Sequence, residues 1–210
     1  MSNNLIIGGP RTGKTSLLRK YFLENYDGGP CIIFMREAEG STLKTCLIGD
    51  GLSETDFLHL RTSDMMNFSI PKVIPPIVFL TVSGEFNGEL SQSFKDMVVA
   101  LVKKMPISTE IYLDDAGYWG EDVRLFADCN LTAIYQSMNQ LSQIIVEHEK
   151  FVDTFQFITF FANNDTKTHE LARRCMFKKE LPVTADIGHV IRNLPRHCLL
   201  LAGPPSQIEL

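Results

Sequence analysis

The chain has 210 residues and a mass of 23.7 kDa, and a chain of this size buries about 70 % of its surface on folding, enough for one sizeable core. With 44 % hydrophobic and 21 % charged residues, the composition excludes disordered, collagen-like and disulfide-scaffold classes and favours a single α/β domain. The formal net charge of −5 argues against a protein that coats nucleic acid by bulk attraction.

The sequence carries no membrane or export signal. No apolar run reaches the length of about 18 residues that a membrane helix needs. The N-terminus, Met1-Ser2-Asn3-Asn4, lacks the basic start and apolar stretch of a secretory signal, so we expect a soluble protein in the cytoplasm. The five cysteines show no spacing typical of a zinc site, and we interpret them as reduced thiols.

Short apolar runs alternate with helical patterns along the chain, as is typical of an α/β domain. Strands are predicted at 5–7, 31–35, 77–82, 110–115, 131–136, 154–161 and 198–202. Helices are predicted over 13–25, 88–105, 137–150 and 166–176, and the mixed segment 36–73 is not assigned. These elements predict one domain over residues 1–210, with a mainly parallel central sheet covered by helices on both faces.

A phosphate-binding loop is predicted between the first strand and the first helix. Residues 8–15 fit the pattern G-x-x-x-x-G-K-[ST], whose glycines let backbone N–H groups turn inward around phosphates. Lys14 is expected to reach the β- and γ-phosphates of ATP, and the Thr15 hydroxyl to hold Mg²⁺. This motif predicts a RecA-like, three-layer P-loop NTPase core. The predicted nucleotide-binding residues are Gly8, Gly9, Pro10, Arg11, Thr12, Gly13, Lys14, Thr15 and Ser16.

Two acidic residues end the predicted strand 110–115. Asp114 is best placed to hold Mg²⁺, directly or through water. In ATPases with a strand inserted between the two motifs, the next carboxylate polarises the attacking water, and Asp115 occupies that position. Most such ATPases have glutamate there, so the shorter aspartate leaves open a different water geometry or a base supplied elsewhere, for instance by Glu121. An exposed turn is the alternative interpretation of the acidic pair.

Gln136 is a polar residue at the end of the otherwise apolar strand 131–136. Such a side chain can touch the γ-phosphate and transmit its loss to the rest of the domain, which makes Gln136 a candidate catalytic residue. Taken alone, the segment is equally compatible with a glutamine that faces solvent.

The second half of the chain resembles a known family. A strand ending in Gln136, a helix containing Leu141, and then Phe157-Ile158-Thr159-Phe160-Phe161-Ala162-Asn163-Asn164-Asp165 before a helix with Thr168 are similar to the FtsK/HerA superfamily of DNA-pumping ATPases. Members of this superfamily have an Asn and an Asp-x-x-Thr at the corresponding place. The apolar run 198–202, followed by Gly203 and Pro204, is similar to the family's terminal strand. The resemblance covers residues 4–205.

This resemblance implies a homo-oligomeric ring, usually a hexamer, in which an arginine of one subunit reaches the nucleotide of its neighbour. In the FtsK branch that arginine lies about eleven residues before the strand-end glutamine, and Arg124 lies twelve before Gln136. Arg124 is therefore the candidate arginine finger, with Arg11, Arg173 and Arg174 as competing choices. A solvated helix arginine is the plainer interpretation.

Double-stranded DNA is the partner that the resemblance implies. The residues from Phe161 onward carry seven basic and five acidic side chains, and the densest basic cluster is Arg173, Arg174, Lys178 and Lys179. These side chains are candidates for a DNA contact, although a solvated helix end favoured by the helix dipole is also compatible with them.

The expected function is an ATP-driven translocase of double-stranded DNA. Because the phosphate loop begins at residue 8, we expect no preceding membrane or barrel domain, and the bare core resembles viral ATPases that package a genome into a capsid. A capsid or membrane-vertex protein is then a further partner, and the host cytoplasm or the virion the location. The alternatives are an assembly or secretion ATPase that moves no DNA and, less favoured, a small P-loop nucleoside or nucleotide kinase.

Overall fold

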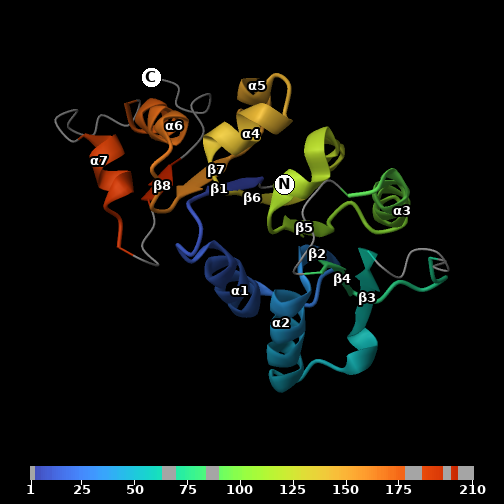
Figure 1. Cartoon of the computed structure of the whole chain (residues 1–210). Helices are drawn as coiled ribbons and strands as arrows, with labels where there is room; N and C mark the ends of the chain where they lie inside the picture. The colour runs from blue at the N-terminus through green and yellow to red at the C-terminus, as the bar shows by residue number, and fades with distance from the viewer. Residues whose placement is uncertain (1–2, 63–69, 84–89, 178–185, 196–199, 203–210) are drawn as a thin grey trace.

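One sheet organises the chain, and Figure 1 shows it in a computed structural model that describes residues 3–62, 70–83, 90–177, 186–195 and 200–202. Within these residues, eight strands pair in the order β3-β4-β2-β5-β6-β1-β7-β8. Strands β1 to β7 run parallel, and β8 pairs antiparallel with β7 at one edge. The strands are β1 (Asn4–Ile7), β2 (Cys31–Arg36), β3 (Phe57–Arg61), β4 (Ile77–Val82), β5 (Glu110–Leu113), β6 (Asn130–Tyr135), β7 (Phe157–Phe160) and β8 (Leu200–Ala202).

Helices cover both faces of this sheet (Figure 1). Helices α1 and α2 lie on one face, and the other helices pack on the opposite face or beyond the β7 edge. The predicted three-layer α/β fold of the RecA-like type, with a mainly parallel sheet, is confirmed. The helical segments are α1 (Lys14–Asn25), α2 (Glu37–Gly49), α3 (Gln92–Val102), α4 (Met138–Ile144), α5 (His148–Val152), α6 (Thr166–Phe177), α7 (Ile187–Arg192) and the 3₁₀ segments η1 (Glu54–Asp56) and η3 (Ala116–Phe126).

The central strands are buried on both faces, as their continuous apolar runs predict. In β1, Leu5 and Ile7 belong to the apolar cluster under α3, η3 and α4, whereas Ile6 belongs to the cluster under α1 and α2. Trp119 is fully buried in the first cluster, where its ring meets Phe34 and Phe126 with centroids 5.4 and 5.0 Å apart. Such edge-to-face pairs stabilise by about 0.5–1.5 kcal/mol beyond their buried area.

The unassigned segment 36–73 contains helix α2, η1 and strand β3. Only Gly40, Leu43 and Leu47 of α2 are buried, so its apolar stripe is thin and one of its three positions is a glycine. A Cβ on Gly40 would lie 2.9 Å from the Thr81 side chain, so this glycine permits the close packing of α2 on β4. The helix pattern is therefore weak in the sequence even though the helix packs tightly.

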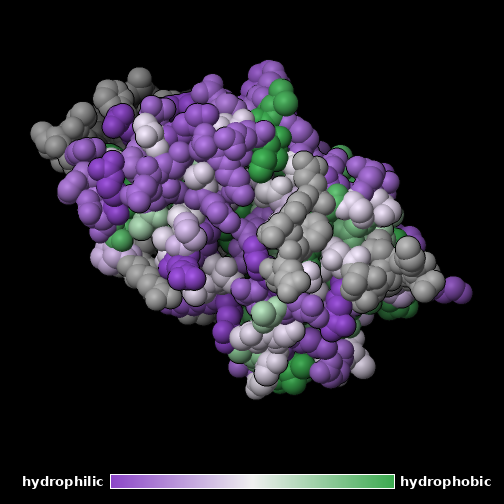
Figure 2. Space-filling view, viewed as in Figure 1, coloured by the Kyte–Doolittle hydropathy of each residue, from purple (hydrophilic) through white to green (hydrophobic). Residues whose placement is uncertain are grey.

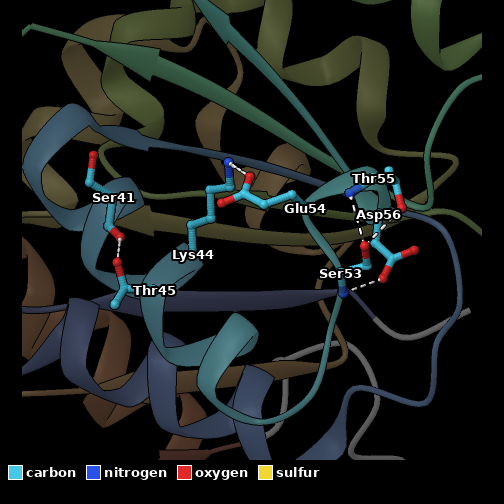
Figure 3. A network of polar contacts seen from close by, with 7 residues as sticks. All are labelled: Ser41, Lys44, Thr45, Ser53, Glu54, Thr55 and Asp56. Atoms are coloured by element: carbon cyan, nitrogen blue, oxygen red, sulfur yellow. Dashed lines mark hydrogen bonds and ion pairs between the residues drawn. The ribbon is translucent and has the colours of Figure 1, made fainter.

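A polar network joins α2 to the start of β3 (Figure 3). The Ser53 N–H donates to Asp56 at 2.7 Å and the Ser53 hydroxyl accepts from the Thr55 N–H, which closes a capping box around η1. Lys44 of α2 forms an ion pair with Glu54 at 2.6 Å. These contacts fix the chain entering β3, the edge strand furthest from the phosphate loop.

Several predicted elements have different bounds in the structure, among them the predicted strand 110–115, which ends at Leu113. The predicted helix 137–150 is two helices, α4 and α5, separated at Glu147, whose backbone is left-handed with φ 52°. Of the predicted helix 88–105, residues Gln92–Val102 are helical with Ser91 as the cap, and 88–89 lie outside the described residues. The predicted strand 154–161 is shorter, spanning only Phe157–Phe160. Of the predicted strand 198–202, residues 200–202 form β8, and 198–199 lie outside the described residues.

Candidate functional site

The predicted phosphate loop lies at the carboxyl edge of the sheet, between β1 and α1. The Gly8 N–H donates to the Tyr135 carbonyl at 3.2 Å and the Gly9 N–H to the Ala162 carbonyl at 2.9 Å. These bonds hold the loop against the ends of the two strands that flank β1. Gly13 precedes α1 with φ 106°, a conformation that side chains with a Cβ rarely adopt. The loop geometry therefore depends on glycine at this position.

Lys14 lies inside the curve of this loop. Its Nζ donates to the Gly9 carbonyl at 2.7 Å, and the Thr12 hydroxyl donates to the same oxygen at 2.8 Å. The lysine is only 8 % exposed, and burial lowers the pKa of its ammonium, partly offset by the charges of Asp114 and Asp115. A buried cation at a helix N-terminus is favourably placed to receive an anion such as a phosphate.

Thr15 and Asp114 meet across the sheet, although they are 99 residues apart in the sequence. The Thr15 hydroxyl donates to Asp114 Oδ2 at 2.7 Å. Strand β6 lies between β1 and β5, so the two predicted motifs are separated by one inserted strand. Hydroxyl and carboxylate oxygens are the ligands that Mg²⁺ prefers in proteins. The structure thus brings together the two residues predicted to hold the metal.

Within the described residues, no three histidine, cysteine or acidic side chains group closely enough to form a metal cage by themselves. Mg²⁺ is usually bound through one or two carboxylates together with substrate phosphates and water, and needs no such cage. The oxygens of Thr15 and Asp114 therefore fit a metal that arrives with a nucleotide.

Asp114 is a buried carboxyl group, 8 % exposed. Burial raises its pKa to about 6; the hydrogen bond from Thr15 and the charge of Lys14 act in the opposite direction, whereas Asp115 and Glu39 add to the rise. Asp114 is held in place by its backbone N–H, which donates to the Phe34 carbonyl of β2 at 2.9 Å. The Asp114 carboxylate is therefore held where it can bind a cation, and its burial destabilises the charged form while no cation is bound.

Asp115, the predicted water-polarising residue, lies beside Lys14 and pairs with Arg36. Its backbone is left-handed, with φ 59°, and its Oδ2 lies 3.6 Å from Arg36 Nε. Arg36 also donates to the Tyr118 hydroxyl at 2.9 Å, so it connects the end of β2 to η3. Arg36 was not among the predicted site residues, because it belongs to the segment that the sequence pattern leaves unassigned.

Gln136 stands at the end of β6, next to the phosphate loop, with an exposed side chain. Its carbonyl accepts a hydrogen bond from Asn163 Nδ2 at 2.9 Å, and its N–H donates to Gln140 Oε1 at 2.8 Å. The main chain of Gln136 is therefore fixed from both sides, while its side chain is exposed.

Asp165 ties the ends of β6 and β7 to the helices that follow them. Its Oδ2 accepts from the Asn139 N–H at 3.1 Å, the Thr168 N–H at 2.9 Å and the Thr168 hydroxyl at 2.6 Å. The Thr168 hydroxyl in turn accepts from the Met138 N–H at 2.9 Å. Asn163 joins this network through its Oδ1, which accepts from the Asp165 N–H at 2.9 Å. Gln136, Asn163, Asp165 and Thr168, four of the residues that carry the family resemblance, thus form one connected polar network.

Arg124 and Glu121 lie at the connection between α4 and α5. Arg124 Nε lies 2.8 Å from Glu121 Oε2, and the guanidinium also donates to the Val146 carbonyl. Glu121 accepts from the Val146 N–H, and the Arg124 guanidinium lies over the Phe151 ring, 5.9 Å from its centroid. Within the described residues, the contacts of the Glu121 carboxylate are with Arg124 and the Val146 N–H.

The other predicted cations have separate locations. Arg11 is exposed on the loop with φ 59°, and Arg173 and Arg174 are exposed on α6. Arg174 pairs with Glu149 at 3.1 Å. Lys178 and Lys179 lie outside the described residues. Hydrophilic residues cover most of the face over α4, α5 and α6 in Figure 2, which agrees with a solvated surface there.

A cavity of about 350 Å³ lies beside Thr15, between α1 and α2. No residue of α2 was predicted for the site, because the sequence pattern left the segment 36–73 unassigned. The lining residues are Thr15, Ser16, Arg19, Met35, Ala38, Glu39, Thr42 and Leu43.

Comparison with known proteins finds no protein-family model that matches the chain and no similar curated protein. Among the described helices, none is long and apolar enough to cross a membrane.

Replacing Asp114 with asparagine should change how stability depends on pH. Because the folded-state pKa is raised, stability from the protonated carboxyl is fully present below pH 4 and is lost as pH rises through about 6. The asparagine variant avoids this loss, so without ligand it should gain up to about 3 kcal/mol over the original chain at pH 7.5. Urea unfolding at pH 4.5 and 7.5 measures the free energy of unfolding of each protein, and Asp153→Asn, at an exposed position, is the control. The same change between the two pH values in Asp114→Asn and the original chain would contradict the raised pKa of Asp114.

Thr168→Val should destabilise the protein by about 1–3 kcal/mol, because it leaves the Met138 N–H unpaired in a buried place and takes one hydrogen bond from Asp165. Valine has nearly the same shape, so the loss reports the hydroxyl and not the packing. Thr166→Val, at an exposed position of the same helix, is the matched control. Denaturant unfolding compares the two, and equal midpoints would show that the network adds nothing to stability.

Proposed function

We propose that this protein hydrolyses ATP with Mg²⁺ as its cofactor. The observation that carries the proposal is the hydrogen bond of 2.7 Å between Thr15 and Asp114, across the inserted strand β6. A threonine after the loop lysine and an aspartate at a strand end are the two groups that hold Mg²⁺ in P-loop NTPases. The inserted strand is the arrangement of ATPases that transfer the γ-phosphoryl group to water.

The residues of the site have separate roles in this reaction. Loop N–H groups and Lys14 bind the β- and γ-phosphates, and Thr15 and Asp114 orient the Mg²⁺ ion, which supplies positive charge to the phosphates. Asp115 accepts a hydrogen bond from the attacking water. The water oxygen bonds to the γ-phosphorus, the bond from that phosphorus to the bridging oxygen breaks, and ADP and phosphate leave. Gln136 is placed to contact the γ-phosphate and transmit its loss.

The work that this hydrolysis drives is, in the same proposal, translocation of double-stranded DNA by a ring of subunits of the FtsK/HerA type. The support is the network that joins Gln136 through Asn163 to Asp165 and Thr168, because these are the residues of the resemblance. Such a network can transmit to helix α6 a structural change that begins at the end of β6 when the γ-phosphate is lost. Packaging of a viral genome, with a hexameric ring, a capsid or membrane-vertex partner and a location in the host cytoplasm or virion, is the most specific form of the proposal.

The test is the steady-state ATPase rate against protein concentration, with and without linear double-stranded DNA. A ring motor should show a rate per subunit that rises with concentration and rises again with DNA. Lys14→Ala should reduce turnover at least a hundredfold, because it removes the cation that binds the transferred phosphoryl group. Lys20→Ala, an exposed lysine on the same helix, is the control and should keep the original rate.

The other outcomes of this test point to other functions. A DNA-independent ATPase rate favours an assembly or secretion ATPase. Transfer of phosphate to a nucleoside or nucleotide, detected as a phosphorylated acceptor, would identify a kinase. Turnover that survives Lys14→Ala would contradict the site itself.

A variant of Arg124 tests whether the subunits act together as a ring. A finger acting on a neighbouring subunit must leave Glu121 and Val146, its contacts within the same chain. Arg124→Ala should then keep nucleotide affinity and lower turnover in the assembled state by about a hundredfold or more, because the neighbour's transition state loses a cation. Nucleotide titration and the ATPase rate at high concentration measure both quantities. Arg192→Ala, at an exposed arginine of α7 with no predicted role, is the control. Normal turnover in Arg124→Ala would exclude Arg124 as the finger.

A further inference from the structure

Glu39 lies next to the proposed metal ligands although it is 75 residues from Asp114. It belongs to the first turn of α2, which begins directly after β2. Strand β2 pairs with β5, with Phe34 opposite Leu113, and the Asp114 N–H extends this ladder by bonding the Phe34 carbonyl. The end of β2 therefore brings the start of α2 to the same sheet edge as Asp114.

The cavity beside Thr15 has two walls, and Glu39 is the acidic residue in its lining. Thr15, Ser16 and Arg19 come from α1, and Ala38, Glu39, Thr42 and Leu43 from α2. The cavity volume of about 350 Å³ leaves room for a hydrated ion beside the Thr15 hydroxyl.

One carboxylate oxygen of Glu39 has no partner. Glu39 Oε2 is buried and forms no hydrogen bond within the described part of the chain. Its charge is one of the causes that raise the pKa of Asp114, so the two carboxylates are close enough to repel each other. A buried acceptor near a second negative group is unfavourable unless a cation or its water shell lies between them.

The two remaining acidic groups of the site have different surroundings. Asp115 pairs with Arg36 and acts electrostatically on Lys14, the phosphate-binding residue. Both carboxylates act on Asp114, but of the two it is Glu39 that lines the cavity beside Thr15. Glu39 is therefore the carboxylate that shares a cavity with a proposed metal ligand.

We propose that Glu39 is a positioning residue for Mg²⁺, whose Oε2 accepts a hydrogen bond from a water in the ion's hydration shell. Mg²⁺ gives up its waters reluctantly and keeps several of them in proteins, so groups that accept from those waters hold the ion in place. The inference rests on the proposed nucleotide site and adds to it a third residue, from an element that the phosphate-loop motif does not include.

The test is the affinity for ADP, measured by titration calorimetry with the full chain at a series of Mg²⁺ concentrations. Glu39→Gln keeps the size of the side chain and removes its charge. It should raise the Mg²⁺ concentration needed for half of the Mg²⁺-dependent gain in ADP affinity by about tenfold, and leave ADP affinity without Mg²⁺ unchanged. Glu37→Gln is the matched control, because Glu37 lies on the same turn and pairs with Arg61 at 2.8 Å.

The outcomes separate this inference from the proposed function. If the original chain binds no ADP with or without Mg²⁺, the nucleotide site itself is wrong. If it binds ADP, but Glu39→Gln keeps the original Mg²⁺ dependence or weakens ADP equally with and without Mg²⁺, Glu39 does not position the metal. Circular dichroism checks that Glu39→Gln is folded. If that variant fails to fold, Glu39→Asp, which keeps the charge on a shorter side chain, must still raise the Mg²⁺ concentration required. An unchanged Mg²⁺ requirement in Glu39→Asp overturns the inference.

Discussion

The hydrogen bond between Thr15 and Asp114 is the constraint on which the site depends, because it joins helix α1 to the end of β5. Strand β5 lies two positions from β1 in the sheet, and the phosphate loop joins β1 to α1. Asp114 directly follows β5, and Thr15 lies in the first turn of α1. Parallel strands bring their carboxyl ends to one edge of the sheet. The inserted strand β6 sets the separation of the two motifs and places Gln136 between them. The proposed metal ligands and the proposed γ-phosphate contact therefore share one edge of the sheet as a result of the strand order and of the loop that joins β1 to α1.

The same edge connects the site to the rest of the domain. Loop residues Gly8 and Gly9 bond the ends of β6 and β7, and the network around Asp165 joins those strand ends to α4 and α6. Gln136, Asn163, Asp165 and Thr168 are therefore joined by consecutive hydrogen bonds that reach α6. The proposed coupling of hydrolysis to motion would need such a connection.

The sequence predicted the parts of the fold that have strong local signals. Continuous apolar runs identified the buried strands, and the loop motif identified Lys14, Thr15 and the need for an acid such as Asp114. Helix α2 escaped prediction because one of its three buried positions is Gly40, which contributes no apolar signal. Segment η3 escaped because a 3₁₀ segment around Trp119 has no helical period. Arg36 and Glu39 were not predicted as site residues, because only the pairing of β2 with β5 in the folded sheet brings them to the site.

The buried charged groups of the proposed nucleotide site destabilise the ligand-free fold. Lys14 is a buried cation whose pKa is lowered by desolvation, and Asp114 is a buried carboxyl whose pKa is raised by it. Glu39 adds an unpaired oxygen to the same edge. The magnesium nucleotide of the proposal would supply an anion for Lys14 and a hydrated cation for the two carboxylates. Because a ligand that binds only the folded state stabilises it, the proposed nucleotide would then offset the cost of these buried charges.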